Sequence, residues 1–178
     1  MAVLVLYASK HGSTKGIAEH IAAKLRESGH ETQALPIDAA AGVASFDAVV
    51  LGSAVYYGSW MKEAVEYIHQ HQAELAQHPV WLFSVGPLGV EVKENQEQPK
   101  ELAEFRETIR PRDHHLFFGA LDHNKLSFPE RMVIKAVRAP EGDFRDWNDV
   151  DAWTDSIVRS LAPTQPEQGS TATAPGPA

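Results

Sequence analysis

Apolar runs of strand length alternate with amphipathic helical patterns over most of the chain, and this alternation constrains the fold more than any other feature. A continuous apolar run is typical of a parallel strand that is buried on both faces. The predicted strands span 3–8, 32–37, 46–52, 80–85 and 116–121. Five strands that alternate with helices predict an α/β fold with an open parallel sheet and right-handed crossovers.

Apolar side chains at helical spacing predict the connecting helices. Gly29 is a stop signal for the first of them. Ser59 is a good N-cap, so the second helix is expected to begin at Trp60 and to run to about Gln77. The other helices are marked by Ile17, Ile21 and Leu25, by Leu102, Phe105 and Ile109, and by Val150, Trp153, Ile157 and Leu161.

The chain of 178 residues is predicted to hold one domain, residues 1–162. Residues 122–148 lie between the fifth strand and the last helix and include a short helical stretch marked by Phe128, Met132, Ala136 and Val137. Residues 163–178 are Pro, Thr, Gln, Gly, Ser and Ala with one charge, so we expect a disordered tail that buries too little apolar surface to fold.

Charge and cysteine content exclude several classes of protein. The formal net charge of −8 argues against nucleic acid and anionic membrane surfaces as partners, since both select basic faces. The chain has no cysteine, which removes disulfides, thiolate catalysis and iron–sulfur clusters. No apolar stretch approaches the roughly 20 residues that span a bilayer, so no integral membrane segment is expected. We predict a soluble, cytoplasmic protein.

The predicted site lies at the carboxyl ends of the strands, in the loops that start at Ser9, Ser53 and Ser84. The first loop is short, rich in hydroxyls, and followed by a helix N-terminus, which suits a phosphate monoester. The alternative is that Ser9 and Ser13 only cap the helix. The loop contains neither a G-x-G-x-x-G dinucleotide motif nor a G-x-x-x-x-G-K-[ST] motif, and it lacks the acidic residues that a magnesium-dependent receiver domain needs.

Eight spaced positions at the N-terminus resemble the flavodoxin signature for the FMN phosphate. These positions are Val5, Leu6, Tyr7, Ser9, Gly12, Thr14, Ala18 and Ile21. The resemblance implies a flavodoxin-like three-layer α/β sandwich, a five-stranded parallel sheet of order 2-1-3-4-5, and non-covalent FMN, with a deazaflavin as the alternative cofactor. It implies phosphate contacts from Ser9, His11, Gly12, Ser13 and Thr14, while Lys10 either adds positive charge or faces solvent.

Further segments are similar to the menaquinone-dependent protoporphyrinogen dehydrogenases and their flavodoxin-domain relatives. These segments are 51–58, 117–121, 129–135 and Asp146-Trp147. The similarity implies an FMN-dependent oxidoreductase with flavin N5 as the reactive centre, a quinone as acceptor and a porphyrinogen as substrate. It also implies that residues 122–148 are an insertion after the fifth strand. The alternative is a flavodoxin electron carrier between redox partner proteins, with no small-molecule substrate. No nucleophile–base pair or paired carboxylates are positioned for acid–base chemistry, so no catalytic side chain is predicted.

The second and third loops are expected to complete the cofactor site. The candidate residues are Ser53, Ala54, Val55, Tyr56, Tyr57 and Gly58, then Ser84, Val85, Gly86, Pro87, Leu88 and Gly89. Tyr56 or Tyr57 is expected to stack on the flavin ring, unless one of them packs with Trp60 in the core. Gly58 either allows close approach to flavin N5 or only ends the loop. The Gly-Pro-Leu-Gly run departs from the best-known protoporphyrinogen dehydrogenases.

Histidine and acidic residues gather at several places in the sequence. His69 and His71 point to different sides of a helix, and His114 and His115 to opposite faces of a strand, so no metal site is predicted. Acidic residues gather at 91–104 and 143–151. They form either a solvated helix face or an acidic rim that steers a basic redox partner.

Overall fold

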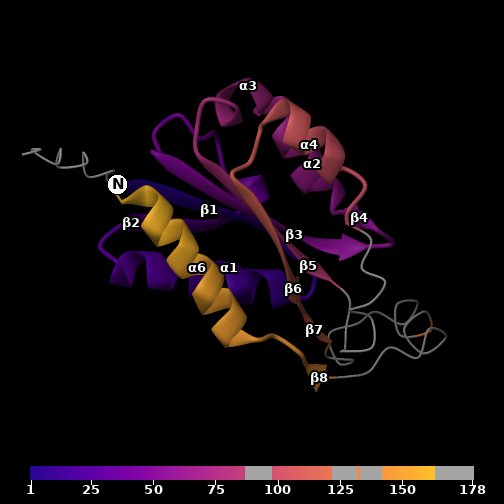
Figure 1. Cartoon of the computed structure of the whole chain (residues 1–178). Helices are drawn as coiled ribbons and strands as arrows, with labels where there is room; N and C mark the ends of the chain where they lie inside the picture. The colour runs from indigo at the N-terminus through magenta and orange to yellow at the C-terminus, as the bar shows by residue number, and fades with distance from the viewer. Residues whose placement is uncertain (87–97, 122–131, 133–141, 163–178) are drawn as a thin grey trace, which may run out of the picture.

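Five parallel strands form the central sheet, in the order β2-β1-β3-β5-β6 (Figure 1). The computed structural model describes residues 1–86, 98–121, 132 and 142–162. The strands are β1 (Ala2–Ala8), β2 (Glu31–Pro36), β3 (Ala48–Tyr56), β5 (Val80–Gly86) and β6 (Asp113–Phe118). The short β4 (Ser59–Trp60) pairs antiparallel with the end of β3. Numbered without β4, the order is the predicted 2-1-3-4-5.

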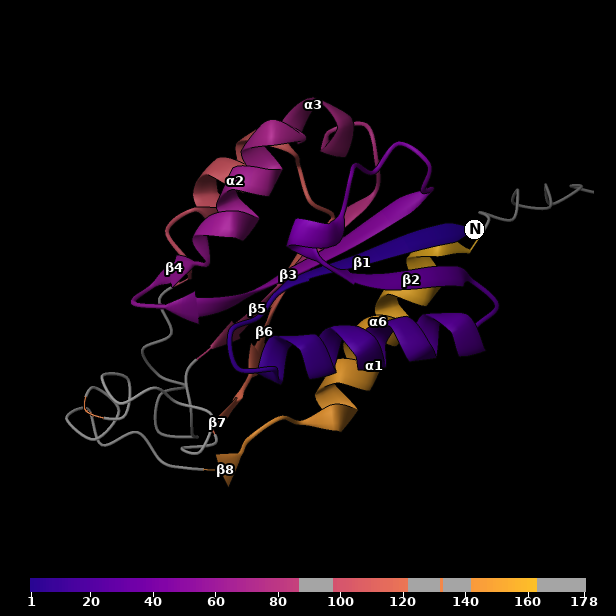
Figure 2. The ribbon, with the colours of Figure 1, turned by 180° about the vertical axis from the view of Figure 1, so that it is seen from behind.

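Helices cover both faces of the sheet, as Figures 1 and 2 show from opposite sides. One face carries α1 (Ser13–Glu27) and α6 (Trp147–Leu161). The other carries α2 (Lys62–Gln70), α3 (Gln72–Leu75) and α4 (Leu102–Thr108), and the 3₁₀ turn η1 (Ile37–Ala39) packs beside α2. Beyond β6, the two-residue strand β7 (Ala120–Leu121) pairs with β8 (Gly142–Asp143).

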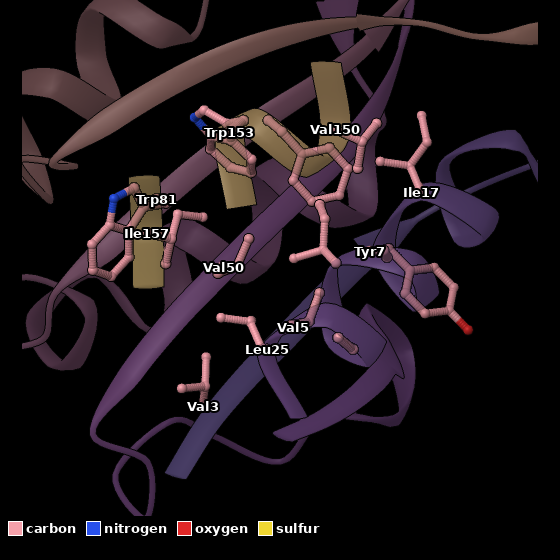
Figure 3. Packing of buried hydrophobic residues seen from close by; sticks show 14 of the residues in the cluster. Val3, Val5, Tyr7, Ile17, Leu25, Val50, Trp81, Val150, Trp153 and Ile157 are labelled. Carbon is pink, nitrogen blue, oxygen red and sulfur yellow. The ribbon is translucent and has the colours of Figure 1, made fainter. Parts of the chain in front are cut away.

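Two apolar clusters, one under each helical layer, hold the three layers together. Alternate residues of the central strands supply both clusters, because successive side chains of a strand point to opposite faces. Val3 and Val5 pack toward α1 and α6, whereas Leu4 and Leu6 pack toward α2 and α4. Figure 3 shows the first cluster, in which Trp153 of α6 lies among side chains of the sheet. This two-sided burial explains the continuous apolar runs.

The predicted start of the second helix at Trp60 is wrong. Ser59 and Trp60 form β4, with Trp60 opposite Val55 in the ladder, and α2 begins only at Lys62. Helical structure is interrupted at His71, between α2 and α3. A two-residue strand contains too few residues to show a period, and serine is favoured in turns as well as at helix N-caps. The local pattern therefore favoured a helix.

The fifth parallel strand is displaced from its predicted span of 116–121. It begins at Asp113 and ends at Phe118, and Ala120 and Leu121 leave the central sheet to pair with β8. His114 and His115 are polar and precede the apolar run, so the sequence pattern does not show that the strand begins before Leu116. Their ring nitrogens are hydrogen-bonded to Ser84 and Asp149 in the folded chain.

Some predictions fall on residues outside the described part of the chain. They concern Pro87, Leu88 and Gly89, most of the insertion, and the tail from 163 to 178. Within the described residues, no helix is long and apolar enough to cross a membrane. No group of three or more potential metal ligands occurs in that same part of the chain.

Candidate cofactor site at the carboxyl edge of the sheet

The first loop joins β1 to α1 through a left-handed turn at Gly12. The φ angle of Gly12 is +91°, a conformation that residues with a side chain rarely adopt. The Gly12 N–H donates to Ser9 Oγ over 3.1 Å, and the Gly12 carbonyl accepts the first helical hydrogen bond from Gly16 at 3.0 Å. The turn thus directs the backbone of the loop into the first turn of α1.

Thr14 brings an unsatisfied hydroxyl to this helix end. Its side chain is 1% exposed, and Oγ1 has no hydrogen-bond partner among the described residues. A buried hydroxyl without a partner costs about 1–3 kcal/mol. The first turn of α1 also contains no acidic residue. The N–H groups of that turn have no acceptor within the helix and carry the positive end of its dipole. The loop therefore suits an anion that accepts several hydrogen bonds.

The other residues of the first loop take different positions. Ser13 Oγ accepts a hydrogen bond from the Ala120 N–H at 2.9 Å, which ties the N-terminus of α1 to β7. Ser9 and His11 are half-buried, and Lys10 is exposed. The structure thus brings the predicted phosphate-loop residues together in one turn. Ser9 Oγ and Ser13 Oγ each accept a backbone N–H, and each hydroxyl keeps its own proton to donate.

The second loop is the tight turn of the β3–β4 hairpin. Tyr57 and Gly58 both have positive φ, 52° and 73°, as the tip of a two-residue hairpin requires. Tyr57 is 89% exposed and Tyr56 is 41% exposed. Trp60 instead lies in the core, with its ring centroid 5.5 Å from that of Phe105. The hairpin therefore presents two tyrosines at the carboxyl edge and anchors itself through Trp60.

The predicted serines at the strand ends support the hairpin. Ser53 Oγ accepts from the Met61 N–H at 3.0 Å and donates to the Ala54 carbonyl at 2.9 Å. Ser84 Oγ accepts from Trp60 Nε1 at 2.8 Å. Both serines are fully buried. The protein itself satisfies their hydroxyls, so these two side chains support the hairpin through hydrogen bonds.

A residue that no sequence pattern singled out, Arg145, packs against the first turn of α1. The guanidinium of Arg145, held by Asp143, lies so near Gly16 that a Cβ there would meet Nη1 at 2.6 Å. Arg145 also stacks over Trp147, 4.7 Å from the ring centroid. A basic residue without periodic context gives no sequence signal of such a contact. The β7–β8 segment therefore packs directly on the first turn of α1.

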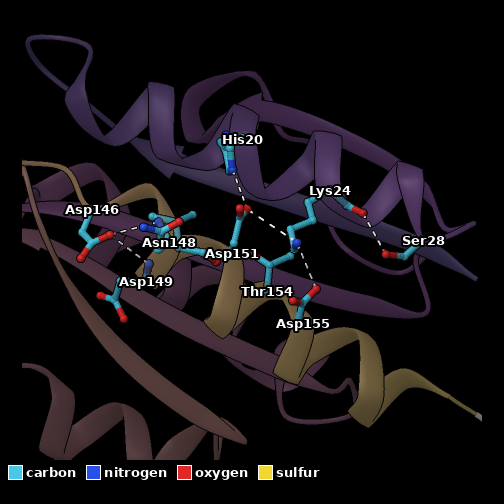
Figure 4. A network of polar contacts seen from close by, with 10 residues as sticks. His20, Lys24, Ser28, Asp146, Asn148, Asp149, Asp151, Thr154 and Asp155 are labelled. Carbon is cyan, nitrogen blue, oxygen red and sulfur yellow. Dashed lines mark hydrogen bonds and ion pairs between the residues drawn. The ribbon is translucent and has the colours of Figure 1, made fainter.

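A polar network joins α1 to α6 (Figure 4). His20 Nε2 lies 2.8 Å from an Asp151 carboxylate oxygen, and Lys24 Nζ lies 3.1 Å from Asp155. The hydrogen bond from His20 lowers the pKa of Asp151. Asp146 caps α6 by accepting from the N–H groups of Asn148 and Asp149. The Asp146-Trp147 pair noted in the sequence thus has a structural role in starting α6.

Comparisons with known proteins show the family to which the chain belongs. Residues 4–148 match the family described as flavodoxin domain. The chain belongs to the flavodoxin-domain family. It is 23% identical over 160 residues to protoporphyrinogen IX dehydrogenase (quinone) of Escherichia coli (strain K12), which covers 87% of this chain and 88% of that protein.

Solved structures show the same fold at low identity. Oxidised flavodoxin 1 of Bacillus cereus superposes with a TM-score of 0.61 at 12% identity, over 91% of this chain and all of that one. Rubredoxin oxygen:oxidoreductase of Desulfovibrio gigas gives a TM-score of 0.61 at 15% identity over 90% of this chain. The match spans only 36% of that larger protein's length.

Membership in this family implies FMN as the cofactor, and the described residues fit it. The Thr14 hydroxyl, which has no partner within the described part of the chain, and the first turn of α1 meet the needs of a phosphate group. The exposed tyrosines of the hairpin offer aromatic faces to a ring system. Both features lie at the carboxyl edge of the sheet, where ligands of open parallel sheets bind.

Proposed function

We propose that this chain is an FMN-dependent oxidoreductase of the protoporphyrinogen dehydrogenase type, with a quinone as acceptor. The observation that carries the proposal is the span of the similarity to the Escherichia coli enzyme. It includes 87% of this chain and 88% of that protein, so it is not confined to the phosphate loop. When bound, FMN supplies the redox chemistry, with N5 as its reactive atom.

In this proposal the first loop binds the phosphate of FMN. The Thr14 hydroxyl and the first-turn N–H groups of α1 donate to the phosphate oxygens, with Gly12 setting the direction of the loop. The exposed Lys10 and the half-buried His11 belong to the same loop. Hydrogen bonds to a charged acceptor contribute about 1.5–3 kcal/mol each, so this loop accounts for much of the affinity.

The hairpin tip then faces the flavin ring. Tyr56 and Tyr57 supply the aromatic contact, and Gly58 leaves room beside them because it has no side chain. The backbone of Val85 and Gly86, at the end of β5, borders the same edge. We include Pro87, Leu88 and Gly89 as the continuation of this border from their place in the sequence.

A flavodoxin electron carrier is the second candidate. It is favoured by the formal net charge of −8 and by the acidic residues on exposed positions of α2 and α4, which suit docking to a basic redox protein. A carrier has no small-molecule substrate, so a single assay of substrate turnover distinguishes the two candidates.

The test uses the full chain loaded with FMN and supplied with protoporphyrinogen and a menaquinone analogue. The enzyme proposal expects porphyrin formation that depends on the quinone. FMN binding without turnover contradicts it and supports the carrier. In that case, reduction by a basic reductase should slow as salt rises, because salt screens the attraction between exposed charges. A rate independent of salt contradicts the carrier.

A deletion variant locates the substrate-binding part. Removing residues 125–140 takes out the centre of the insertion but leaves the phosphate loop and the β3–β4 hairpin intact. The proposal expects loss of turnover with unchanged FMN affinity. Unchanged turnover contradicts a substrate role for the insertion. The matched control is removal of residues 164–178, which should change neither quantity.

A further inference from the structure

Three buried polar side chains form a hydrogen-bonded chain beneath the β3–β4 hairpin. Trp60 Nε1 lies 2.8 Å from Ser84 Oγ, and Ser84 Oγ lies 2.8 Å from His114 Nε2. The residues come from β4, β5 and β6, so the chain crosses from the hairpin to the edge strand of the sheet. Trp60 and Ser84 are almost completely buried and His114 is half-buried.

The chemistry of the three groups determines which of them donates each hydrogen bond. An indole nitrogen only donates, so Trp60 must donate to Ser84. The single hydroxyl proton of Ser84 then remains for His114, whose Nε2 accepts it when the imidazole is neutral and carries its proton on Nδ1. If His114 were charged, Nε2 would donate instead, and the Ser84 hydroxyl would lose this acceptor.

The surroundings of His114 keep the imidazole neutral. Burial under α4, together with the positive charge of Arg106, lowers the pKa of His114 to about 4, and Asp113 opposes this change only in part. The Asp113 carboxylate also accepts from Trp153 Nε1 at 2.7 Å. His115 points to the other face and lies 2.9 Å from an Asp149 oxygen. Ser84 therefore retains its acceptor at neutral pH.

The hairpin depends on such contacts because its ladder is very short. Only two residue pairs join β3 to β4. Beyond them, the Gly58 carbonyl accepts from the Lys100 N–H at 3.1 Å, and the Trp60 N–H donates to Glu101 at 3.3 Å. Within the hairpin's turn and β4, Trp60 is the side chain that reaches the core, so its indole fixes how the hairpin sits on the sheet.

We propose that His114 is a positioning residue for the candidate flavin site. Through Ser84 it holds the indole of Trp60, and through Trp60 it sets the place of Tyr56, Tyr57 and Gly58 at the carboxyl edge. His114 does not itself reach the site, because Trp60 and Ser84 lie between His114 and the hairpin tip. The effect on cofactor binding rests on the proposed function. The hydrogen bonds among Trp60, Ser84 and His114 can be tested in the protein without cofactor.

The first test observes the indole N–H of Trp60 by NMR in the cofactor-free protein, at pH 7. Changing His114→Leu removes the acceptor, so the Trp60 signal should shift and its hydrogen exchange should accelerate. His114→Gln retains an acceptor oxygen at similar reach and should restore both to nearly wild-type values. The control is His115→Gln on the opposite face, which should leave the Trp60 signal in place. If the chemical shift and the hydrogen exchange of the Trp60 indole N–H are the same in His114→Leu as in the wild type, the proposal is overturned.

The second test measures FMN affinity and the flavin reduction potential in the same variants. His114→Leu should weaken FMN binding about tenfold and shift the potential, and His114→Gln should stay within about twofold of the wild type. Equal affinity and potential in all variants, with the Trp60 signal displaced, overturns the positioning role. If the wild type binds no FMN, the proposed function fails, whereas the NMR comparison still decides whether His114 holds the hairpin.

Discussion

Phe83 occupies the space that a side chain at position 52 would need. Gly52 and Phe83 are paired across the β3–β5 ladder, and the Phe83 ring lies directly over the Cα of Gly52. Phe83 is fully buried between the sheet and α6, where its ring also meets Trp153. The requirement for glycine at position 52 therefore comes from a neighbouring strand rather than from backbone conformation.

Changing Gly52→Ala should destabilise the protein by about 3 kcal/mol, because a rigid, buried ring must move to admit the methyl group. Urea unfolding followed by circular dichroism measures the change. A double variant that adds Phe83→Leu should recover part of the loss, since the smaller side chain makes room. A mild effect of Gly52→Ala, within about 0.5 kcal/mol of wild type, contradicts the packing described.

Changing Thr14→Val should separate cofactor binding from folding. The hydroxyl of Thr14 has no partner among the described residues, so its replacement by a methyl group should leave the stability of the cofactor-free protein equal or higher. FMN affinity should fall about tenfold or more, because the phosphate loses a donor. Thermal unfolding and fluorescence titration measure the two effects. A loss of stability without a loss of affinity would assign Thr14 to the scaffold instead.

Changing Asp146→Ala should cost about 1 kcal/mol, the usual contribution of an N-cap, because two N–H groups of α6 lose their acceptor. Asp146→Asn retains a capping oxygen and should recover most of that stability. Chemical unfolding of both variants tests the difference. FMN affinity should be unchanged in both, and a selective loss of affinity in either would show that Asp146 contributes to the site.

Much of the fold was predictable because its determinants are local. The runs at 3–8 and 80–85 are apolar on both strand faces, and α1 repeats its apolar residues every four positions. These patterns predicted the strands and helices, the family resemblance implied the strand order, and the spacing from Ser9 to Thr14 located the first loop. Residues that act within a few positions of one another leave this kind of signal.

The remaining features depend on contacts between distant segments. The hydroxyl of Ser84, in a predicted cofactor loop, bonds to Trp60 and His114, which lie 24 and 30 positions away. Ser59 resembled a helix cap because the pairing of Trp60 with Val55 is invisible locally. Arg145 follows β8, and its guanidinium lies beside Gly16 of α1 in the folded chain. The spacing of residues in one sequence does not show such contacts.

The pH dependence of stability should contain a contribution from His114. Its pKa is about 4 in the folded chain and 6.5 as the ordinary value. Between these values the unfolded chain binds a proton that the folded chain does not, so the free energy of unfolding falls as pH decreases from about 6.5 to about 4. The loss amounts to at most about 3 kcal/mol.

The His114→Gln variant isolates this contribution, because glutamine does not titrate. Urea unfolding at several pH values between 4 and 7 should show a shallower decline for this variant than for the wild type. His30, whose pKa is also lowered by burial, and the acidic residues remain in both proteins and cancel in the comparison. Parallel pH profiles would show that His114 titrates normally in the folded chain.

The most direct test of the central claim is a pair of calorimetric titrations of the cofactor-free protein, one with FMN and one with riboflavin. The two ligands share the ring system and differ in the phosphate that the first loop is proposed to bind. We expect tight binding of FMN and at least about a hundredfold weaker binding of riboflavin, since a phosphate held by several charged hydrogen bonds contributes a few kcal/mol. Equal affinities, or no heat with either ligand, would contradict the assignment of this loop to the FMN phosphate.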